Sequence, residues 1–175
     1  MDLFGSTRDA RRFLLQLIVV LWLPLLVLAF LIQPFKVEGR SMQPGLMNGE
    51  RILVNKLAAR IGTIERGDIV VFHSPADPGR TLVKRVVGLP GETIEIRTGS
   101  LLVDGRPLLE AEHRGKLPAT VELGPVRLGG SAYFVLGDNR SDSEDSRIWG
   151  PLERRLILGR AAVAYWPLFA AGPLD

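Results

Sequence analysis

Three polar features of the 175-residue sequence contain side chains that could do chemistry together. Ser41 lies in residues 39–45, where two glycines and a proline predict tight turns. Lys84 lies in the apolar run 81–88, and a dense polar loop ends at residues 143–147. A serine hydroxyl becomes a strong nucleophile only when a nearby base removes its proton. A lysine buried among apolar side chains has a lowered pKa and can be that base. A serine–lysine pair is therefore one interpretation of the three features.

Each feature also has a purely structural interpretation. Lysine in an edge strand can extend its amine into solvent, and serines in turns commonly hydrogen-bond to nearby backbone. The loop 138–147 alternates acidic residues at Asp138, Asp142 and Glu144, as calcium loops do, but it lacks the glycine at the sixth position. We therefore interpret it as a turn held by Asp–Arg pairs and expect no metal site and no cofactor.

Composition narrows the chemistry further. The chain contains no cysteine, which excludes disulfides, thiolate catalysis and iron–sulfur clusters. Its two histidines, His73 and His113, are 40 residues apart and give no local pair with metal-ligand spacing. The formal charge is +3, but the 22 basic residues are interspersed with 19 acidic ones, so we expect no nucleic-acid partner.

The N-terminal part of the chain predicts a membrane anchor. Residues 13–32 carry no formal charge, and 20 helical residues extend roughly 30 Å, the thickness of a hydrocarbon core. Three arginines precede this run, so the positive-inside rule places residues 1–12 in the cytoplasm. We expect a tail at 1–12, a single transmembrane anchor at 13–34 and an extracytoplasmic domain at 35–175. A cleavable signal peptide is the competing interpretation, but its apolar core is normally shorter.

The remainder predicts a mostly β domain with antiparallel strands. Short runs rich in β-branched residues, bounded by turn residues, indicate strands at 51–55, 67–72, 81–88, 93–97, 101–103, 131–136 and 157–166. Residues 98–131 predict a compact excursion, within which 108–130 are weakly patterned. We expect no substantial helix after the anchor.

Four segments in this order resemble the bacterial type I signal peptidases, which are membrane-bound serine–lysine proteases. They are residues 41–44 (Ser-Met-Gln-Pro), 67–72 (Gly-Asp-Ile-Val-Val-Phe), 83–91 (Val-Lys-Arg-Val-Val-Gly-Leu-Pro-Gly) and 137–147, which contains Gly-Asp-Asn-Arg and Asp-Ser-Arg. With the N-terminal anchor, the resemblance covers nearly the whole chain. It implies a signal-peptidase-like antiparallel β catalytic core with one transmembrane helix in the bacterial cytoplasmic membrane.

The resemblance also implies roles for individual residues. Ser41 is expected to be the nucleophile and Lys84 the neutral general base, with Ser143 orienting the lysine amine. Asp145 and Arg147 are expected to form a supporting ion pair, beside Arg85 as scaffold. The residues expected to contact substrate are Phe35, Val37, Gly39, Met42, Leu46, Leu82 and Val83.

The implied activity is removal of signal peptides from secretory preproteins through an acyl-enzyme, with cleavage after small residues in Ala-x-Ala sequences. The implied partners are the signal peptide, bound as an added strand, and the lipid bilayer, against an apolar surface that includes Trp166, Leu168 and Phe169. The sequence departs from the family at Gly39, where some members carry a hydroxyl residue that helps the oxyanion hole. Two other classes stay open: a cytosolic self-cleaving serine–lysine regulator and a non-catalytic membrane-anchored β-module. The sequence does not indicate an oligomeric state.

Overall fold

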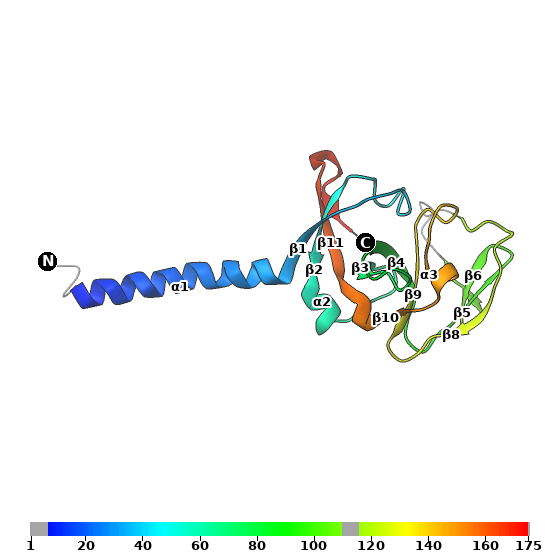
Figure 1. Cartoon of the computed structure of the whole chain (residues 1–175), viewed down its shortest axis with the longest axis horizontal. Coiled ribbons are helices and arrows are strands. Elements are labelled where there is room, and N and C mark those ends of the chain that lie inside the picture. The colour runs from blue at the N-terminus through cyan, green and yellow to red at the C-terminus, as the bar shows by residue number, and fades with distance from the viewer. Residues whose placement is uncertain (1–6, 110–115, 175) are drawn as a thin grey trace.

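A long N-terminal helix leads into a β domain in the computed structural model, which describes residues 7–109 and 116–174 (Figure 1). Helix α1(Thr7–Leu31) contains Pro24, and its segment Ala10–Val27 has a mean hydropathy of 1.8 with none of its residues buried. It is long and apolar enough to cross a membrane. The helix begins six residues before the anchor predicted at 13–34 and ends three residues before its predicted end, because the chain continues as strand β1(Ile32–Lys36). His113 and residues 1–6 of the predicted tail lie outside the described residues.

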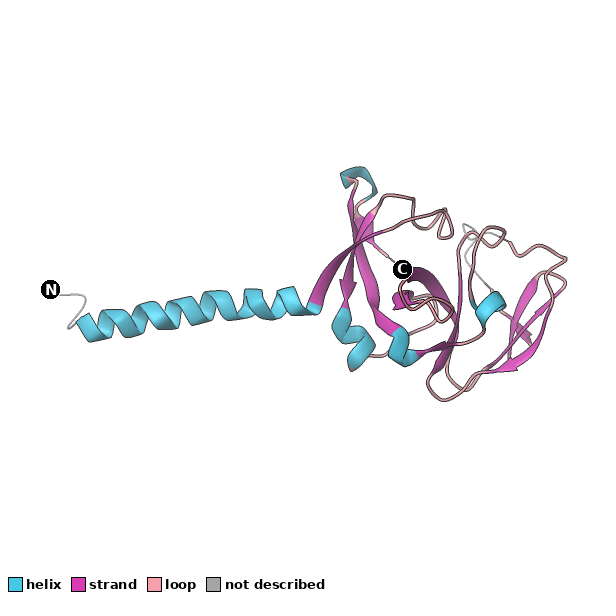
Figure 2. Cartoon of the chain, viewed as in Figure 1, coloured by secondary structure: helices cyan, strands magenta, loops and turns pink. Residues whose placement is uncertain are grey.

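The larger of two sheets connects helix α1 to the rest of the domain. Its strand order is β1-β2-β11-β3-β4-β9-β10, all paired antiparallel, with β12 added to β11. The strands are β1(Ile32–Lys36), β2(Arg51–Asn55), β3(Ile69–His73), β4(Thr81–Gly88), β9(Ala132–Leu136), β10(Leu152–Glu153), β11(Ile157–Trp166) and β12(Gly172–Pro173). Because β1 follows α1 directly, the sheet begins where this helix ends (Figure 2).

A smaller sheet lies at the far end of the domain from α1 (Figure 1). Its order is β7-β6-β5-β8, formed by β5(Thr93–Arg97), β6(Ser100–Val103), β7(Arg106–Pro107) and β8(Leu123–Arg127). Ile94 and Ile96 of β5 pack with Phe134 and Leu136 of β9 in one buried cluster. This cluster joins the two sheets.

The expected fold class is confirmed, with differences in detail: β1, β7, β8, β10 and β12 lie outside the predicted strand ranges. Strands β2, β4, β5 and β11 have the predicted bounds. Strand β8, within the weakly patterned segment, was missed because its sequence contains a glycine and a proline, which are uncommon in strands. The expectation of no further helix was wrong for short elements. These are α2(Lys56–Arg60), α3(Ser146–Trp149) and the 3₁₀ turns η1(Arg154–Leu156) and η2(Leu168–Ala170).

An open edge lies in the middle of the large sheet. Strand β4 pairs with β3 from Thr81 to Arg85, whereas β9 pairs with β4 only from Arg85 to Gly88. Among the described residues, Thr81–Lys84 therefore have no strand partner on the β9 side. Strand β1 is also an end strand of this sheet and pairs only with β2. The chain leaving β1 contains Ser41. The serine turn therefore follows one free edge of the sheet, β1, and the open half of β4 is a second free edge.

Candidate active site

The turn that carries Ser41 is attached to the core at both ends. Val37 N–H donates to the Glu50 carbonyl at 2.8 Å, and Gly49 N–H donates to the Val37 carbonyl at 2.8 Å. Met42 and Leu46, only 2% and 1% exposed, anchor the turn in a buried apolar cluster. The segment therefore presents Ser41 from a fixed loop.

The loop after β9 packs against this turn so closely that only glycine fits. Asn139 N–H donates to the Ser41 carbonyl at 3.0 Å. A Cβ on Gly137 would lie 2.5 Å from that carbonyl oxygen, and a Cβ on Gly45 would lie 2.2 Å from Asp138 Oδ2. Both glycines permit a backbone approach that a side chain would block. The two segments, about a hundred residues apart, thereby form one wall of the site.

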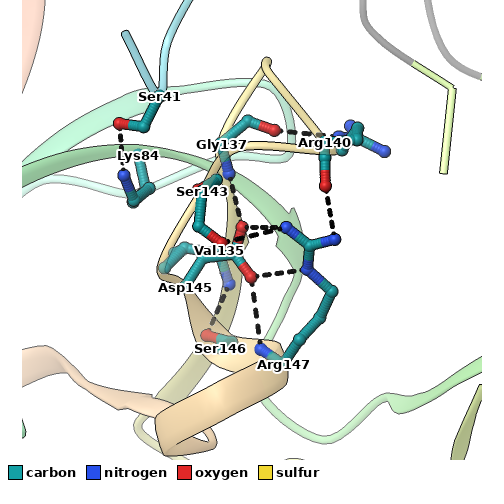
Figure 3. Close-up of polar contacts among 9 residues, drawn as sticks. All are labelled: Ser41, Lys84, Val135, Gly137, Arg140, Ser143, Asp145, Ser146 and Arg147. Atoms are coloured by element: carbon teal, nitrogen blue, oxygen red, sulfur yellow. Dashed lines mark hydrogen bonds and ion pairs between the residues drawn. The ribbon is translucent and has the colours of Figure 1, made fainter. Parts of the chain in front are cut away.

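Lys84 points from β4 to the serine hydroxyl. Its Nζ donates to Ser41 Oγ at 2.5 Å, across 43 residues of sequence (Figure 3). The side chain is 2% exposed. The solvent-exposed alternative considered for this lysine is therefore wrong. The distance is within proton-transfer reach of a nucleophile and its base.

Burial changes the protonation of this lysine. Desolvation lowers the pKa of Lys84 from 10.5 to about 8, the Asp145 and Glu144 carboxylates oppose that shift, and the Arg147 and Arg80 guanidinium groups add to it. None of the ion pairs among the described residues includes Lys84. A pKa of about 8 leaves roughly a tenth of the amine neutral at pH 7. In that neutral form Nζ can accept the proton of the Ser41 hydroxyl.

Arg85, the next residue, is held in a different way. Its Nε donates to Asp138 Oδ1 at 2.9 Å, its second terminal nitrogen donates to Oδ2 at 2.8 Å, and the first donates to the Gly67 carbonyl at 2.7 Å. Arg85 is 2% exposed and Asp138 is fully buried. This bidentate pair ties β4 to the loop that contacts the serine turn, as expected of a scaffold residue.

A carboxylate organises the loop between β9 and α3. Asp145 caps α3, and its carboxylate accepts hydrogen bonds from Gly137 N–H at 3.0 Å and from Arg147 Nε at 2.7 Å. Arg147 also donates to the Arg140 carbonyl at 2.7 Å (Figure 3). The ion pair expected between Asp145 and Arg147 is thus present. It holds the loop that supports Ser41 and places one negative charge near Lys84.

Ser143 does not make the hydrogen bond that its expected role requires. Its Oγ is buried and has no hydrogen-bond partner among the described residues. The serine lies against Gly137, where a Cβ would be 2.2 Å from its Oγ. The residue is at the site, and the structure contains no Lys84–Ser143 hydrogen bond.

The backbone N–H groups of Ser41 and Gly39 differ in their hydrogen bonding. In the described part of the chain, the Ser41 N–H donates no hydrogen bond. Gly39 N–H, by contrast, donates to Asn48 Oδ1 at 2.9 Å. The Ser41 N–H is thus a backbone donor beside the nucleophile that the fold leaves unused.

A cleft of about 370 Å³ lies beside the two residues. It is lined on one side by β1 and the segment after it, and on the other by the open half of β4. The lining residues are Phe35, Lys36, Val37, Glu38, Gly39, Ser41, Met42, Thr81, Leu82, Val83 and Lys84. Of the residues expected to contact substrate, Leu46 is not part of the cleft, because it lies in the core beneath it.

Sequence reasoning missed the contribution of the loop 137–139. Asp138 was interpreted only as a turn residue, yet it pairs with Arg85, 53 residues away. The available signal was the Gly-Asp-Asn run directly after an apolar strand. As for metals, no group of three His, Asp or Glu residues within 7–109 and 116–174 is arranged to hold an ion.

Comparison with known proteins places the chain in a family. The family described as "Signal peptidase, peptidase S26" matches residues 10–166. The signal peptidase I of Leptolyngbya laminosa is 38% identical over 160 residues, covering 85% of this chain and 78% of that protein. The signal peptidase I of Bacillus amyloliquefaciens is 39% identical, covering 86% and 82%.

Among solved structures, a signal peptidase I from Enterococcus faecalis V583 is 34% identical, with a TM-score of 0.44. The alignment covers 56% of this chain and 96% of that one. The family match over residues 10–166 and the identities of the full-length relatives carry the assignment. The chain therefore belongs to the signal peptidase, peptidase S26, family.

Proposed function

We propose that this protein is a membrane-anchored serine endopeptidase that removes N-terminal signal peptides from exported preproteins, with Ser41 as nucleophile and Lys84 as general base. The observation that carries the residue roles is the 2.5 Å contact between Lys84 Nζ and Ser41 Oγ, made by a lysine whose pKa burial lowers to about 8. A buried amine beside a hydroxyl, with no carboxylate pairing, is suited to proton transfer rather than to structural support.

The reaction follows from this geometry. Ser41 Oγ attacks the carbonyl carbon of the residue at −1 while Lys84 Nζ takes the hydroxyl proton. The Ser41 N–H stabilises the oxyanion of the tetrahedral intermediate. Lys84 then passes the proton to the leaving amine, which releases the mature protein and leaves an ester on Ser41. Water attacks this ester while Lys84 accepts a proton from it, and Lys84 returns the proton to Ser41 Oγ as the signal peptide departs.

The substrate is proposed to bind as an extra strand between the two free edges. Thr81–Lys84 offer unpaired backbone groups on one side of the cleft, and β1 with its following segment offers the other side. Main-chain hydrogen bonds then give affinity, and side-chain pockets give selection. Val37 and Val83 are buried where the cleft meets the core, so they favour small side chains at −1 and −3.

The anchor is proposed to place the cleft at the level where its substrates leave the membrane. Strand β1 follows α1 without a linker, so the site is held close to the bilayer surface. The positive-inside rule puts the N-terminal arginines in the cytoplasm and the β domain on the other side. Trp166, Leu168 and Phe169 are 52%, 76% and 93% exposed and would contact lipid beside the anchor.

The test is cleavage of a preprotein with an Ala-x-Ala site by the full-length protein in detergent. The expected product is one shortened chain whose new N-terminus follows the second alanine. Ser41→Ala should abolish turnover, while Ser141→Ala, an exposed hydroxyl on a neighbouring loop, serves as the matched control. Cleavage by the Ser41→Ala protein at an undiminished rate would reject the nucleophile, and no cleavage by the wild type would reject the activity.

A further inference from the structure

A second cavity, of about 290 Å³, adjoins the cleft beside Ser41. Phe35 of β1 and Thr81 of β4 line both cavities. Beyond this shared boundary, the second cavity is lined by the polar residues Gln33, Lys56 and His73 and by the apolar residues Val54, Val71 and Leu158. Gln33 is two residues closer to α1 than Phe35 along β1. The second cavity therefore lies on the membrane side of the cleft.

Strand geometry indicates which part of a bound substrate would reach it. Side chains at every second position of a strand point to the same face, so residues −1, −3 and −5 face the enzyme together. At about 3.3 Å per residue, −5 lies roughly 13 Å from −1. On β4, Thr81 is three residues or about 10 Å before Lys84. A signal peptide that arrives from the membrane thus passes the second cavity first, with its −5 side chain beyond Thr81.

The polar groups in this cavity are not used by the fold. The Lys56 ammonium, at the first position of α2, belongs to no ion pair among the described residues. His73 was expected to be a loop residue, but it ends β3, and its Nδ1 is buried without a hydrogen-bond partner in the part of the chain that the structure describes. Buried polar atoms are normally hydrogen-bonded, so an exception marks a place where a ligand can supply the partner.

We propose that this cavity is a third specificity subsite, which takes the −5 side chain of the signal peptide and favours Glu or Gln over Lys. The inference rests on the proposed function, because it extends the same substrate strand. Lys56 attracts a carboxylate and repels an ammonium, while His73 and Gln33 can exchange hydrogen bonds with an amide or carboxylate. Selection at −5 thus uses charge and hydrogen bonding, whereas selection at −1 and −3 uses size.

The test uses preproteins that share one Ala-x-Ala site and differ only at −5. The kcat/KM of the wild type should be about 5-fold higher for the Glu substrate than for the Lys substrate. A partly solvated ion pair changes a binding constant by up to about 5-fold. Lys56→Glu should reverse this order. Lys116→Glu makes the same charge change at an exposed lysine outside both cavities and should preserve it.

A second pair of variants tests the histidine. His73→Ala should remove the preference for Gln over Ala at −5, and His73→Asn should restore part of it by replacing the lost polar atom. Equal cleavage of all −5 substrates by the wild type, or an unchanged order in Lys56→Glu, would overturn the subsite while the proposed function stands.

A binding measurement separates the two proposals. The Ser41→Ala protein should bind a −5 Glu signal peptide more tightly than a −5 Lys peptide, also by about 5-fold. This readout does not need turnover. If the wild type cleaves nothing, the proposed function fails and the binding ratio still decides the subsite, because equal affinities would overturn it.

Discussion

Two neighbouring cationic residues on β4 are both buried but have different partners. Lys84 and Arg85 are each 2% exposed, yet within residues 7–109 and 116–174 only Arg85 of the two has a carboxylate partner, in its bidentate pair with Asp138. Alternation along a strand sends the two side chains to opposite faces. One side chain meets a serine hydroxyl and the other meets a buried aspartate.

The difference shows what an ion pair does to a buried cation. Asp138 compensates the Arg85 guanidinium for its lost hydration, and the pair joins β4 to the loop 137–139. Lys84 has no paired carboxylate, so desolvation dominates and lowers its pKa to about 8. Lys84, without a paired carboxylate, is therefore suited to proton transfer. Arg85, paired with Asp138, holds the strand and the loop in place.

The largest expected effect comes from giving Lys84 the permanent charge of its neighbour. Lys84→Arg should reduce kcat/KM for a preprotein by about 10³-fold or more, because a guanidinium does not lose its proton and cannot act as a base. Cleavage kinetics of the full-length protein in detergent measure this loss. Arg85→Lys is the matched exchange and should retain far more activity per folded molecule. Near-normal cleavage by Lys84→Arg would contradict the proposed base.

Removing the partner of Arg85 should be the next largest effect. Asp138→Ala leaves a buried guanidinium uncompensated and is expected to lower the free energy of unfolding by about 3–5 kcal/mol. Urea denaturation in detergent measures this change. Asp142→Ala, at an exposed aspartate of the same loop, should change it by less than about 0.5 kcal/mol. A small effect at both positions would mean that the Arg85–Asp138 pair is not structural.

Removing the Lys84 amine, which has no paired carboxylate among the described residues, should raise the free energy of unfolding instead of lowering it. Below pH 8 both the folded and unfolded states carry a charged Lys84, and the folded state bears the desolvation cost. Between about 8 and 10.5 the unfolded state binds more protons, so the stability of the wild type rises with pH. Lys84→Met should therefore be more stable than wild type at pH 7 by on the order of 3 kcal/mol.

The same measurement provides the check on this sign. The advantage of Lys84→Met should shrink as pH rises through this window and disappear near pH 10.5. Urea denaturation at a series of pH values follows it. A destabilised Lys84→Met protein at pH 7 would indicate that packing of the lysine stem outweighs desolvation of its amine.

The pH dependence of catalysis should report the lysine directly. The rate constant kcat/KM should rise about tenfold per pH unit below pH 8 and level off above it, because only the neutral amine accepts the serine proton. Initial rates of preprotein cleavage from about pH 6 to about pH 10, roughly two pH units on each side of the expected midpoint, measure that midpoint. A midpoint near the ordinary value of 10.5 would mean that burial does not tune this group.

The smallest expected effect is a shift in the midpoint of the pH profile of kcat/KM. The Glu144 carboxylate raises the pKa of Lys84, so Glu144→Gln should move the pH profile to lower pH. Glu144 is 44% exposed and partly screened, which keeps the shift small. Glu65→Gln, at another exposed glutamate, should leave the midpoint unchanged. A shift to higher pH would contradict the electrostatic account.

Much of the fold could be predicted from local pattern. The anchor and the bounds of β2, β4, β5 and β11 follow from runs of apolar and β-branched residues. The misses have physical causes. Strand β8 contains Gly and Pro and forms because β5 offers it an edge. Helices α2 and α3 are too short for a periodic signal and depend on capping by Asn55 and Asp145.

The sequence by itself determined which residues were available: a serine in a turn at the end of a membrane span, a lysine in an apolar strand, and an acidic loop, with no cysteine. Only the tertiary structure decided how they meet. Whether Lys84 faces solvent or Ser41 depends on where the turn after β1 lies, 43 residues away in the sequence, and the partner of Arg85 is 53 residues away. Desolvation depends on every group around the amine, so the low pKa of Lys84 arises from packing and not from its neighbours in sequence.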